Sequence, residues 1–487
     1  MTIRQAHQAL ADKKCSALDL TNACLEQIEK LDGAGTSAHL NAFITVTAES
    51  ARAQATAIDA RGVFDNPLCG IPVAIKDLLC TKDIRTTAAS NILSSYVPPY
   101  TCTAVQKLFD AGAIMVGKTN LDEFACGASN ETSYFGPVRN PWDTTRVPGG
   151  SSGGSAVAVA ADECMYALGT DTGGSIRQPA SLTNTVGIKP TYGRVSRFGA
   201  LAMASSLDQI GPIGKTVEDA ALVLQAIAGK DKHDSTTSSV PVPDYTVSMH
   251  QSIKGMTIGV PKECFVEGMQ PAVTDVIKTA ISKLQELGAN VVEVSLPFSA
   301  YGLAVYYILM PSELSSNLAR YDGVRFGLSA NADGLLENYK QTRGSGFGAE
   351  IRRRIMLGTY ALSSGYYDAY YKQAQKVRTL VVNDFKRVYE QVDCIMMPTS
   401  PTIAFKLGEK TADPLSMYLA DIFTVTANIA GVPGISVPCG FAQAPGGSAD
   451  LPVGMQLLGK HFDEASIIRA AYQYEQATDW HTHKPTL

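Results

Sequence analysis

The sequence lacks several features from which function is usually recognised. Its ten cysteines form no Cys-x-x-Cys pair, and no histidine lies between His39 and His233. This spacing argues against a zinc knuckle or a redox dithiol, and it indicates cysteines buried as small apolar residues. No apolar run approaches the roughly 18 residues of a membrane span, and the N-terminus has no signal-peptide core. We therefore expect a cytosolic (cytoplasmic) protein, with no metal and no cofactor in this chain.

The sequence also lacks an excess of positive charge. The 41 Lys and Arg residues are outnumbered by 46 Asp and Glu, which gives a formal net charge of −5. Such a chain offers no broad basic surface for phosphate groups, so a partner is expected to hold any nucleic acid. In contrast, 45% of the 487 residues are apolar and 18% are charged, which provides ample material for a core.

Apolar periodicity and helix-capping patterns predict an α/β fold. Strands that alternate with helices indicate a mixed, mostly parallel central sheet covered by helices on both faces. In chain order, we expect a strand at 70–76, a helix at 103–112, a strand at 113–117, a helix at 216–228, a strand at 256–260, a helix at 271–288 and a strand at 291–296.

The chain is predicted to form one domain over residues 1–487. We expect residues 1–60 to form a helical N-terminal layer and 65–215 to form the core that carries the candidate site. The polar, Pro-rich segment 231–245 is interpreted as a surface excursion. Residues 246–487 are expected to supply the rest of the sheet.

Two loops rich in Gly and Ser, Gly149–Ser155 and Gly169–Ser175, are the most unusual segments. The first has the glycine spacing of a mononucleotide-binding loop but lacks its lysine. It also contains G-x-S-x-G, centred on Ser151 or Ser152, but no strand precedes it as a nucleophile elbow requires. The alternative is a pair of Gly-rich turns or a flexible linker. Two such loops so close together favour backbone shaped for a ligand.

Serine chemistry in these loops would need a base other than histidine. A serine hydroxyl is a weak nucleophile and must be activated by a neighbouring base. Lysine can serve when burial lowers its pKa from about 10.4. Lys76 follows the apolar run Ile71–Ile75 at a predicted strand end, where such burial is expected. The alternative is an exposed Lys76, or one paired with Asp77.

The segments Ala74–Asp77, Gly149–Ser155 and Gly169–Ser181 together resemble the amidase signature family. The resemblance covers essentially the whole chain and implies the amidase-signature fold. Further supporting segments are Leu121–Phe124, Asn130–Gly136, Asn140–Asp143, Arg146–Pro148, Lys189–Ser196, Ser205–Pro212, Arg354–Gly358 and Ala361–Asp368.

The resemblance implies a catalytic triad. Ser175 would be the nucleophile, Ser151 a bridging serine with a cis peptide bond, and Lys76 the base. The oxyanion hole would consist of the backbone N–H groups of Thr172, Gly173, Gly174 and Ser175.

Within the family, the chain is most similar to the glutamine-hydrolysing subunits of tRNA-dependent amidotransferases. This likeness implies a glutamine pocket in which Arg354 binds the carboxylate, Asp421 binds the ammonium and Tyr306 lines the wall. Two alternatives stay open, because Arg354 could lie on a solvated helix face and Asp421 could cap a helix.

Three residues depart from the family pattern: Cys126, Asp162 and Asn184. Asn184 tolerates a left-handed conformation, so we expect a local cost there and no loss of activity.

The function implied by the resemblance is a glutaminase that supplies ammonia to convert Glu-tRNA(Gln) and/or Asp-tRNA(Asn). The implied partners are glutamine, a larger B subunit that uses ATP and Mg²⁺, a small C subunit, and misacylated tRNA bound through the complex, with no membrane. One alternative is a stand-alone hydrolase of small amides. A non-catalytic scaffold is disfavoured, because Lys76, Ser151 and Ser175 are all present.

Overall fold

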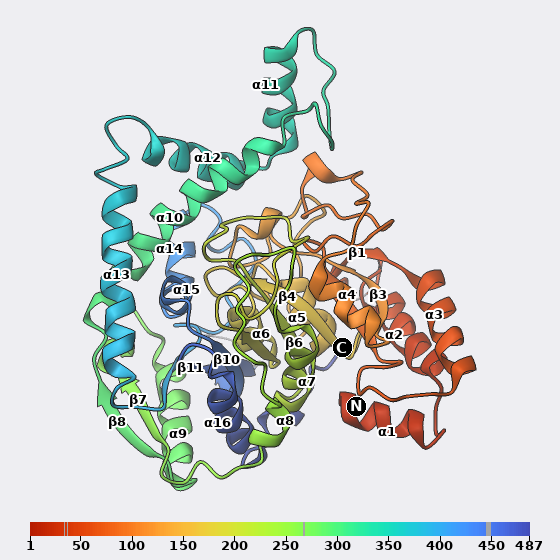
Figure 1. Cartoon of the computed structure of the whole chain (residues 1–487), viewed down its shortest axis with the longest axis vertical. Helices are drawn as coiled ribbons and strands as arrows, with labels where there is room; N and C mark the ends of the chain where they lie inside the picture. Colours follow the sequence, from red (N-terminus) through yellow and green to blue (C-terminus); the bar gives the residue numbers. More distant parts are fainter. Residues whose placement is uncertain (34, 37, 266–267, 445–449) are drawn as a thin grey trace.

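The computed structural model describes residues 1–33, 35–36, 38–265, 268–444 and 450–487. Within these residues, eleven strands form one sheet through the centre of the molecule (Figure 1), in the order β1-β3-β2-β4-β6-β5-β10-β11-β9-β7-β8. The strands are β1 (Phe43–Val46), β2 (Pro72–Lys76), β3 (Ile114–Thr119), β4 (Tyr166–Asp171), β5 (Val186–Lys189), β6 (Gln209–Gly214), β7 (Thr257–Pro261), β8 (Asn290–Val294), β9 (Cys394–Pro398), β10 (Gly434–Gln443) and β11 (Asp450–Gly459).

Helices pack on both faces of this sheet, as the sequence predicted. The α-helices are α1 (Ile3–Ala11), α2 (Ala17–Leu31), α3 (Ala48–Arg61), α4 (Thr103–Asp110), α5 (Gly153–Ala160), α6 (Arg177–Thr183), α7 (Val217–Ile227), α8 (Tyr245–Ser248), α9 (Pro271–Glu286), α10 (Gly302–Asn317), α11 (Leu335–Gly346), α12 (Ala349–Leu362), α13 (Tyr371–Val388), α14 (Pro414–Tyr418), α15 (Val425–Ala430) and α16 (Glu464–Gln476).

The seven predicted elements are confirmed, each within two residues at either end. The four strands are β2, β3, β7 and β8, and the three helices are α4, α7 and α9. The βαβ unit is also confirmed, because β7 and β8 pair in parallel and α9 connects them. Long, strongly periodic apolar segments determine these elements.

The sheet is mixed, but the expectation that it is mostly parallel was wrong. Strands β3, β2 and β4 run parallel at one end, and β9, β7 and β8 run parallel at the other. Between them, β6, β5, β10 and β11 pair antiparallel with their neighbours. Six of the ten strand pairings in the described residues are therefore antiparallel. Periodicity shows where strands lie, but it does not show which strands become neighbours.

The N-terminal 60 residues are not entirely helical. Helices α1, α2 and α3 are present, but Phe43–Val46 forms the edge strand β1, which pairs antiparallel with β3. The segment Phe-Ile-Thr-Val consists of aromatic and β-branched residues, which favour a strand. At the same edge of the molecule, α2 and α3 pack on each other and against β3.

Helices α10, α12 and α13 form a separate layer at the opposite side of the molecule (Figure 1). Gly358 on α12 lies so close to α10 that a Cβ atom there would overlap the carbonyl group of Pro311. This close approach brings α10 and α12 together over a second apolar cluster, which includes Leu309, Leu314 and Ile351. Both helices contribute residues to the candidate site described below.

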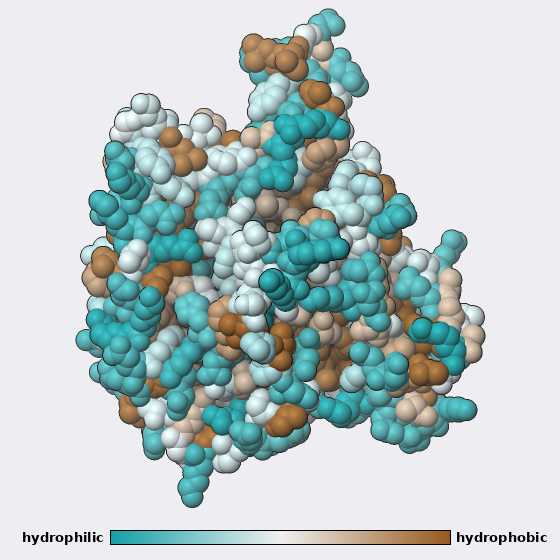
Figure 2. All heavy atoms as spheres, viewed as in Figure 1, coloured by the Kyte–Doolittle hydropathy of each residue, from teal (hydrophilic) through white to brown (hydrophobic). Residues whose placement is uncertain are grey.

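Helix α11 projects from the body of the molecule (Figure 1). Figure 2 shows apolar side chains at the tip of this projection, where α11 begins with the exposed residues Leu335 and Leu336. No helix among the described residues is long and apolar enough to cross a bilayer.

The structure confirms that the cysteines are buried, and it shows the backbone conformation of Asn184. Nine of the ten cysteines are buried and the tenth, Cys15, is half-buried; none forms a disulfide. Asn184 ends α6 in the left-handed conformation, with φ of 61°. Its side-chain amide donates to the carbonyl group of Trp480 at 2.8 Å, so the asparagine also fastens the C-terminal segment.

We predict that Gly358→Ala destabilises the protein because the added methyl group must separate α10 from α12. Overpacking of this kind costs about 1–3 kcal/mol or more. The control is Gly344→Ala on α11, where a Cβ atom meets nothing within 4 Å; it should be neutral or stabilising by up to about 1 kcal/mol. Thermal unfolding measures both. Equal Tm values for the two variants would contradict the proposed close packing.

Candidate active site

Lys76 is the last residue of β2, and its side chain is completely buried. The Nζ atom lies 2.9 Å from Ser151 Oγ, 2.8 Å from Ser152 Oγ and 2.9 Å from Thr170 Oγ1. The alternative of an exposed lysine is therefore excluded. Pairing with Asp77 is excluded as well, because Asp77 instead forms an ion pair with Lys118, at 3.1 Å.

Burial lowers the pKa of Lys76 to about 7, although the carboxylates of Asp122, Asp171 and Asp208 act in the opposite direction. At neutral pH, a large fraction of the molecules thus carries an uncharged amine. A neutral amine has two hydrogens and one lone pair. The Ser152 hydroxyl donates to the Thr170 carbonyl at 3.1 Å, so its oxygen accepts from Lys76. If Thr170 Oγ1 accepts the second hydrogen, the lone pair is directed at Ser151.

Ser151 lies in the turn before α5, and its peptide bond to Gly150 is cis. Gly150 N–H donates to Gln178 Oε1 at 2.9 Å, which holds this turn against α6. Gly150 also packs so tightly on Asp122 that any side chain would collide with it. The glycines of this loop are thus needed for close packing, and the flexible-linker alternative is not supported.

Ser175 lies two residues before α6 and is 7% exposed, on the wall of a cavity. Ser152 N–H donates to the Ser175 carbonyl at 3.1 Å and so joins the two Gly- and Ser-rich loops. The Ser175 hydroxyl itself makes no hydrogen bond to any described residue. The structure thus joins Lys76 to Ser151 directly and brings Ser175 beside them through the backbone; hydrogen bonds between catalytic groups commonly tighten when substrate binds.

The four backbone N–H groups predicted to form an oxyanion hole belong to residues 172–175, at the end of the second Gly- and Ser-rich loop. The N–H groups of Thr172, Gly173 and Ser175 donate to no described residue. Gly174 N–H instead donates to Asp171 Oδ1 at 2.9 Å, so in this structure it is not available for a ligand. Side chains at Gly173 and Gly174 would collide with Tyr306 and Thr424, respectively, which explains the need for glycine at both positions.

Sequence reasoning missed the ion pair that holds this loop. Asp171 and Arg177 are completely buried, with Arg177 Nε 3.1 Å from Asp171 Oδ2. Burial alone would raise the pKa of Asp171, but the Arg177 guanidinium reverses this effect and the pKa falls to about 2. Arg177 also donates to Gln456, Thr424 and Asn428. The sequence did contain a signal for this ion pair, because the oppositely charged Asp171 and Arg177 flank a Gly-rich segment.

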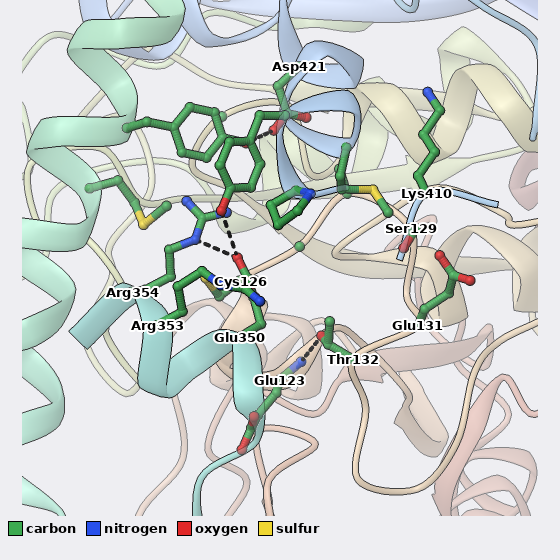
Figure 3. A pocket seen from close by; sticks show the side chains of 18 of the residues that line it. Glu123, Cys126, Ser129, Glu131, Thr132, Glu350, Arg353, Arg354, Lys410 and Asp421 are labelled. Carbon is green, nitrogen blue, oxygen red and sulfur yellow. Dashed lines mark hydrogen bonds and ion pairs between the residues drawn. The ribbon is translucent and has the colours of Figure 1, made fainter. Parts of the chain in front are cut away.

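Ser175 faces a cavity of about 260 Å³, and Figure 3 shows this cavity from close by. Tyr306, Arg354 and Asp421, the three residues predicted to bind substrate, all line it. Other lining residues are Glu123, Cys126, Glu131, Tyr307, Glu350, Arg353, Lys410 and Tyr418. Within the described residues, no group of His, Cys, Asp and Glu side chains has the arrangement of a metal site.

Arg354 is on α12 but not on its solvated face, since the residue is only 3% exposed. Its Nε donates to Glu350 Oε1 at 2.6 Å, and its guanidinium carbon lies 4.6 Å and 4.2 Å from the ring centres of Tyr307 and Tyr418. The buried Nη1 atom has no hydrogen-bond partner among the described residues. A buried guanidinium with a free N–H edge is suited to bind a carboxylate.

Asp421 lies in a short 3₁₀ turn after α14 and is 9% exposed. Its Oδ2 accepts a hydrogen bond from the Tyr307 hydroxyl at 2.9 Å, and its side chain caps none of the described helices. Burial raises the pKa of Asp421 to about 7. The cavity thus presents a cation and an ionisable carboxyl group together with a serine hydroxyl, which is an arrangement suited to a small zwitterion.

The chain is similar to known proteins over nearly its whole length. A family model described as Amidase matches residues 19–468. The A subunit of glutamyl-tRNA(Gln) amidotransferase from Microcystis aeruginosa is 55% identical over 489 residues, which cover 100% of this chain and 99% of that protein. The protein of the same name from Desulfatibacillum aliphaticivorans is 55% identical, with the same coverage.

Solved structures of related proteins are also similar to this chain. The crystal structure of the glutamyl-tRNA(Gln) amidotransferase A subunit from Thermotoga maritima has 43% identity and a TM-score of 0.78, and it covers 97% of this chain and 93% of that one. A peptide amidase in complex with the inhibitor chymostatin has 31% identity and a TM-score of 0.83, with 100% of this chain and 99% of that one covered.

Proposed function

This chain belongs to the amidase family, and on that premise we propose that it is the glutamine-hydrolysing subunit of a tRNA-dependent amidotransferase. It is an enzyme, and its relatives with 55% identity over their full length are named as A subunits of such an amidotransferase. The observation that carries the proposal is that Ser175, Arg354 and Asp421 line one cavity. Their arrangement provides a nucleophile for an amide and opposite charges for an amino acid.

In the proposed reaction, Ser175 Oγ attacks the side-chain amide carbon of glutamine. Its proton passes to Ser151, whose own proton passes to the neutral amine of Lys76. The free N–H groups of the 172–175 loop stabilise the negative charge on the tetrahedral oxygen. The proton then returns to the departing nitrogen, which leaves as ammonia, and water hydrolyses the acyl-Ser175 ester to release glutamate.

The amino-acid end of glutamine is held by the other half of the cavity. The free Nη edge of Arg354 binds the α-carboxylate, and ionised Asp421 binds the α-ammonium. Tyr306 packs against Gly173 and forms the wall between this end and the oxyanion loop. We propose that the pocket thus selects an amino acid and places its amide beside Ser175.

The partners follow from the same proposal. A chain with a net charge of −5 is poorly suited to hold tRNA. We therefore propose a larger B subunit that binds ATP and Mg²⁺, activates Glu-tRNA(Gln) and/or Asp-tRNA(Asn), and uses the ammonia released here. With a small C subunit, the two form a heterotrimer, which acts in the cytoplasm on misacylated tRNA.

The triad generates the first functional prediction. Ser175→Ala should lower glutaminase kcat by about 10⁴-fold or more, and Lys76→Ala should also reduce it strongly without unfolding the chain. In the wild-type protein, kcat should rise with pH through about 7, because Lys76 must lose its proton to act as a base. Ammonia release measures all of these effects.

The control for the triad is Ser282→Ala, a serine whose hydroxyl bonds only to its own helix. It should leave ammonia release unchanged. Glutamine hydrolysis at the wild-type rate by purified Ser175→Ala or Lys76→Ala would exclude the assigned triad.

Arg354 and Asp421, which together we call the glutamine clamp, generate the second functional prediction. Arg354→Ala should raise the KM for glutamine about 30-fold or more, because a buried, charge-assisted contact is lost. Arg354→Lys should be a poor substitute, since lysine lacks the planar fork. The control is Arg352→Ala on the exposed face of the same helix, which should keep the wild-type KM. Unchanged glutamine kinetics in Arg354→Ala would remove the clamp but keep the triad.

The proposed B and C subunits generate the third functional prediction. The isolated chain should bind tRNA weakly at physiological salt, form a stable complex with two further subunits, and hydrolyse glutamine slowly until the complex holds ATP and misacylated tRNA. Affinity purification from the native cell, followed by partner identification and glutaminase assays, tests this prediction. Tight tRNA binding by the chain alone, or full activity without partners, would favour a stand-alone amidase.

A further inference from the structure

Tyr307, which the sequence did not single out, touches both charged residues of the candidate clamp. Its ring lies against Arg354, with 4.6 Å between the guanidinium carbon and the ring centre. Its hydroxyl donates to Asp421 Oδ2 at 2.9 Å. Tyr307 belongs to α10, Arg354 to α12, and Asp421 to the turn after α14, so one side chain connects three separate segments.

The surroundings fix the Tyr307 side chain in this position. Its ring stacks on Tyr418, with ring centres 4.1 Å apart and planes at 19°. The Tyr418 hydroxyl is directed elsewhere, since it donates to Glu350 Oε1 at 3.2 Å. Glu350 also accepts from Arg354 Nε, as Figure 3 shows. The two stacked tyrosines therefore have different partners, and of the two hydroxyls it is that of Tyr307 that bonds to Asp421.

The hydrogen bond from Tyr307 uses one oxygen of Asp421 in a defined way. A phenol hydroxyl that donates to a carboxylate stabilises the ionised form of that carboxylate. With Oδ2 held by Tyr307, Oδ1 is the oxygen that remains for a ligand. The packing of the same ring on Arg354 keeps the guanidinium at a fixed distance from this carboxylate. Tyr307 thus influences the charge of Asp421 and also the distance between Asp421 and Arg354.

We propose that Tyr307 is a positioning residue for substrate selection, which keeps Asp421 ionised and aligned with Arg354 so that the cavity accepts an amino acid bearing both an α-ammonium and an α-carboxylate. This inference rests on the proposed glutaminase function. It goes beyond that function by naming Tyr307 as the residue on which recognition of the ammonium group depends.

The charges around Asp421 make its ionisation sensitive to this one hydrogen bond. Burial raises the pKa of Asp421 to about 7, and the Tyr307 hydroxyl is the largest of the effects that lower it. Arg354 on α12 also lowers this pKa, whereas Asp171 and Asp122 raise it. Lys410, in the loop before α14, is another nearby cation, and burial lowers its own pKa. Tyr306 of α10 also faces the carboxyl group.

The experiment measures glutamine binding to the full chain in a Ser175→Ala background, by calorimetry from pH 5.5 to 8.5. Binding is measured instead of turnover because Lys76 also titrates near pH 7. Affinity should rise with pH as Asp421 loses its proton. Adding Tyr307→Phe removes the hydroxyl but keeps the ring, so the midpoint of this rise should move upward by about one pH unit.

The matched control is Tyr418→Phe, which removes the hydroxyl of the stacked partner ring. It should leave the midpoint in place, because that hydroxyl bonds to Glu350. Asp421→Asn should abolish the rise altogether. The second ligand is 4-carbamoylbutanoate, which is glutamine without its amino group; its affinity should show no loss at neutral pH in Tyr307→Phe. If Tyr307→Phe does not fold, Tyr307→Met replaces it.

The outcomes separate this inference from the function on which it rests. Glutamine binding with the same midpoint in Tyr307→Phe and in its parent would overturn the role of Tyr307 and leave the glutaminase proposal intact. Equal loss of affinity for glutamine and 4-carbamoylbutanoate would show that Tyr307 only packs the pocket. No glutamine binding to Ser175→Ala at any pH would contradict the proposed substrate, and the inference with it.

Discussion

The burial of Lys76 without a carboxylate partner is the condition on which the candidate chemistry depends. Two other lysines on the same sheet are completely buried and show why. Lys118 on β3 forms an ion pair with Asp77, so a carboxylate occupies its amine. Lys189 at the end of β5 also has its pKa lowered to about 7 by burial, but its amine donates to the Pro190 carbonyl. Of these three lysines, Lys76 alone combines a buried amine free of carboxylate contact with serine hydroxyls.

The loop that carries Ser175 is closed by a buried ion pair. Asp171 ends β4 and Arg177 begins α6, so their ion pair closes the loop between strand and helix. Arg177 extends this connection to Asn428 on α15 and to Gln456 on β11, which are distant in the sequence. Removing one partner of a buried ion pair leaves an uncompensated charge, which typically costs about 3–5 kcal/mol. The antiparallel centre of the sheet is what brings these segments together.

Much of this arrangement was accessible from the sequence, and the rest was not for physical reasons. The strand that ends at Lys76 followed from a short apolar run, and the amphipathic helix α9 followed from its periodicity, because both patterns are local. The order of the strands depends on contacts between distant segments, so the antiparallel centre was missed. The same limit explains why Tyr307 was missed: its partners, Arg354 and Asp421, are distant in the sequence.

The environment of Asp421 has a further consequence when it is considered together with that of Lys76. Burial brings both groups to a pKa of about 7, and the proposed reaction needs both of them without their acidic proton. As the pH falls below this value, both groups take up protons, so the fraction of molecules in which both are deprotonated falls more steeply than the fraction for either group alone. In the proposed reaction the site must therefore lose two protons to become active, so its activity would fall on acidification more steeply than a single ionisation allows.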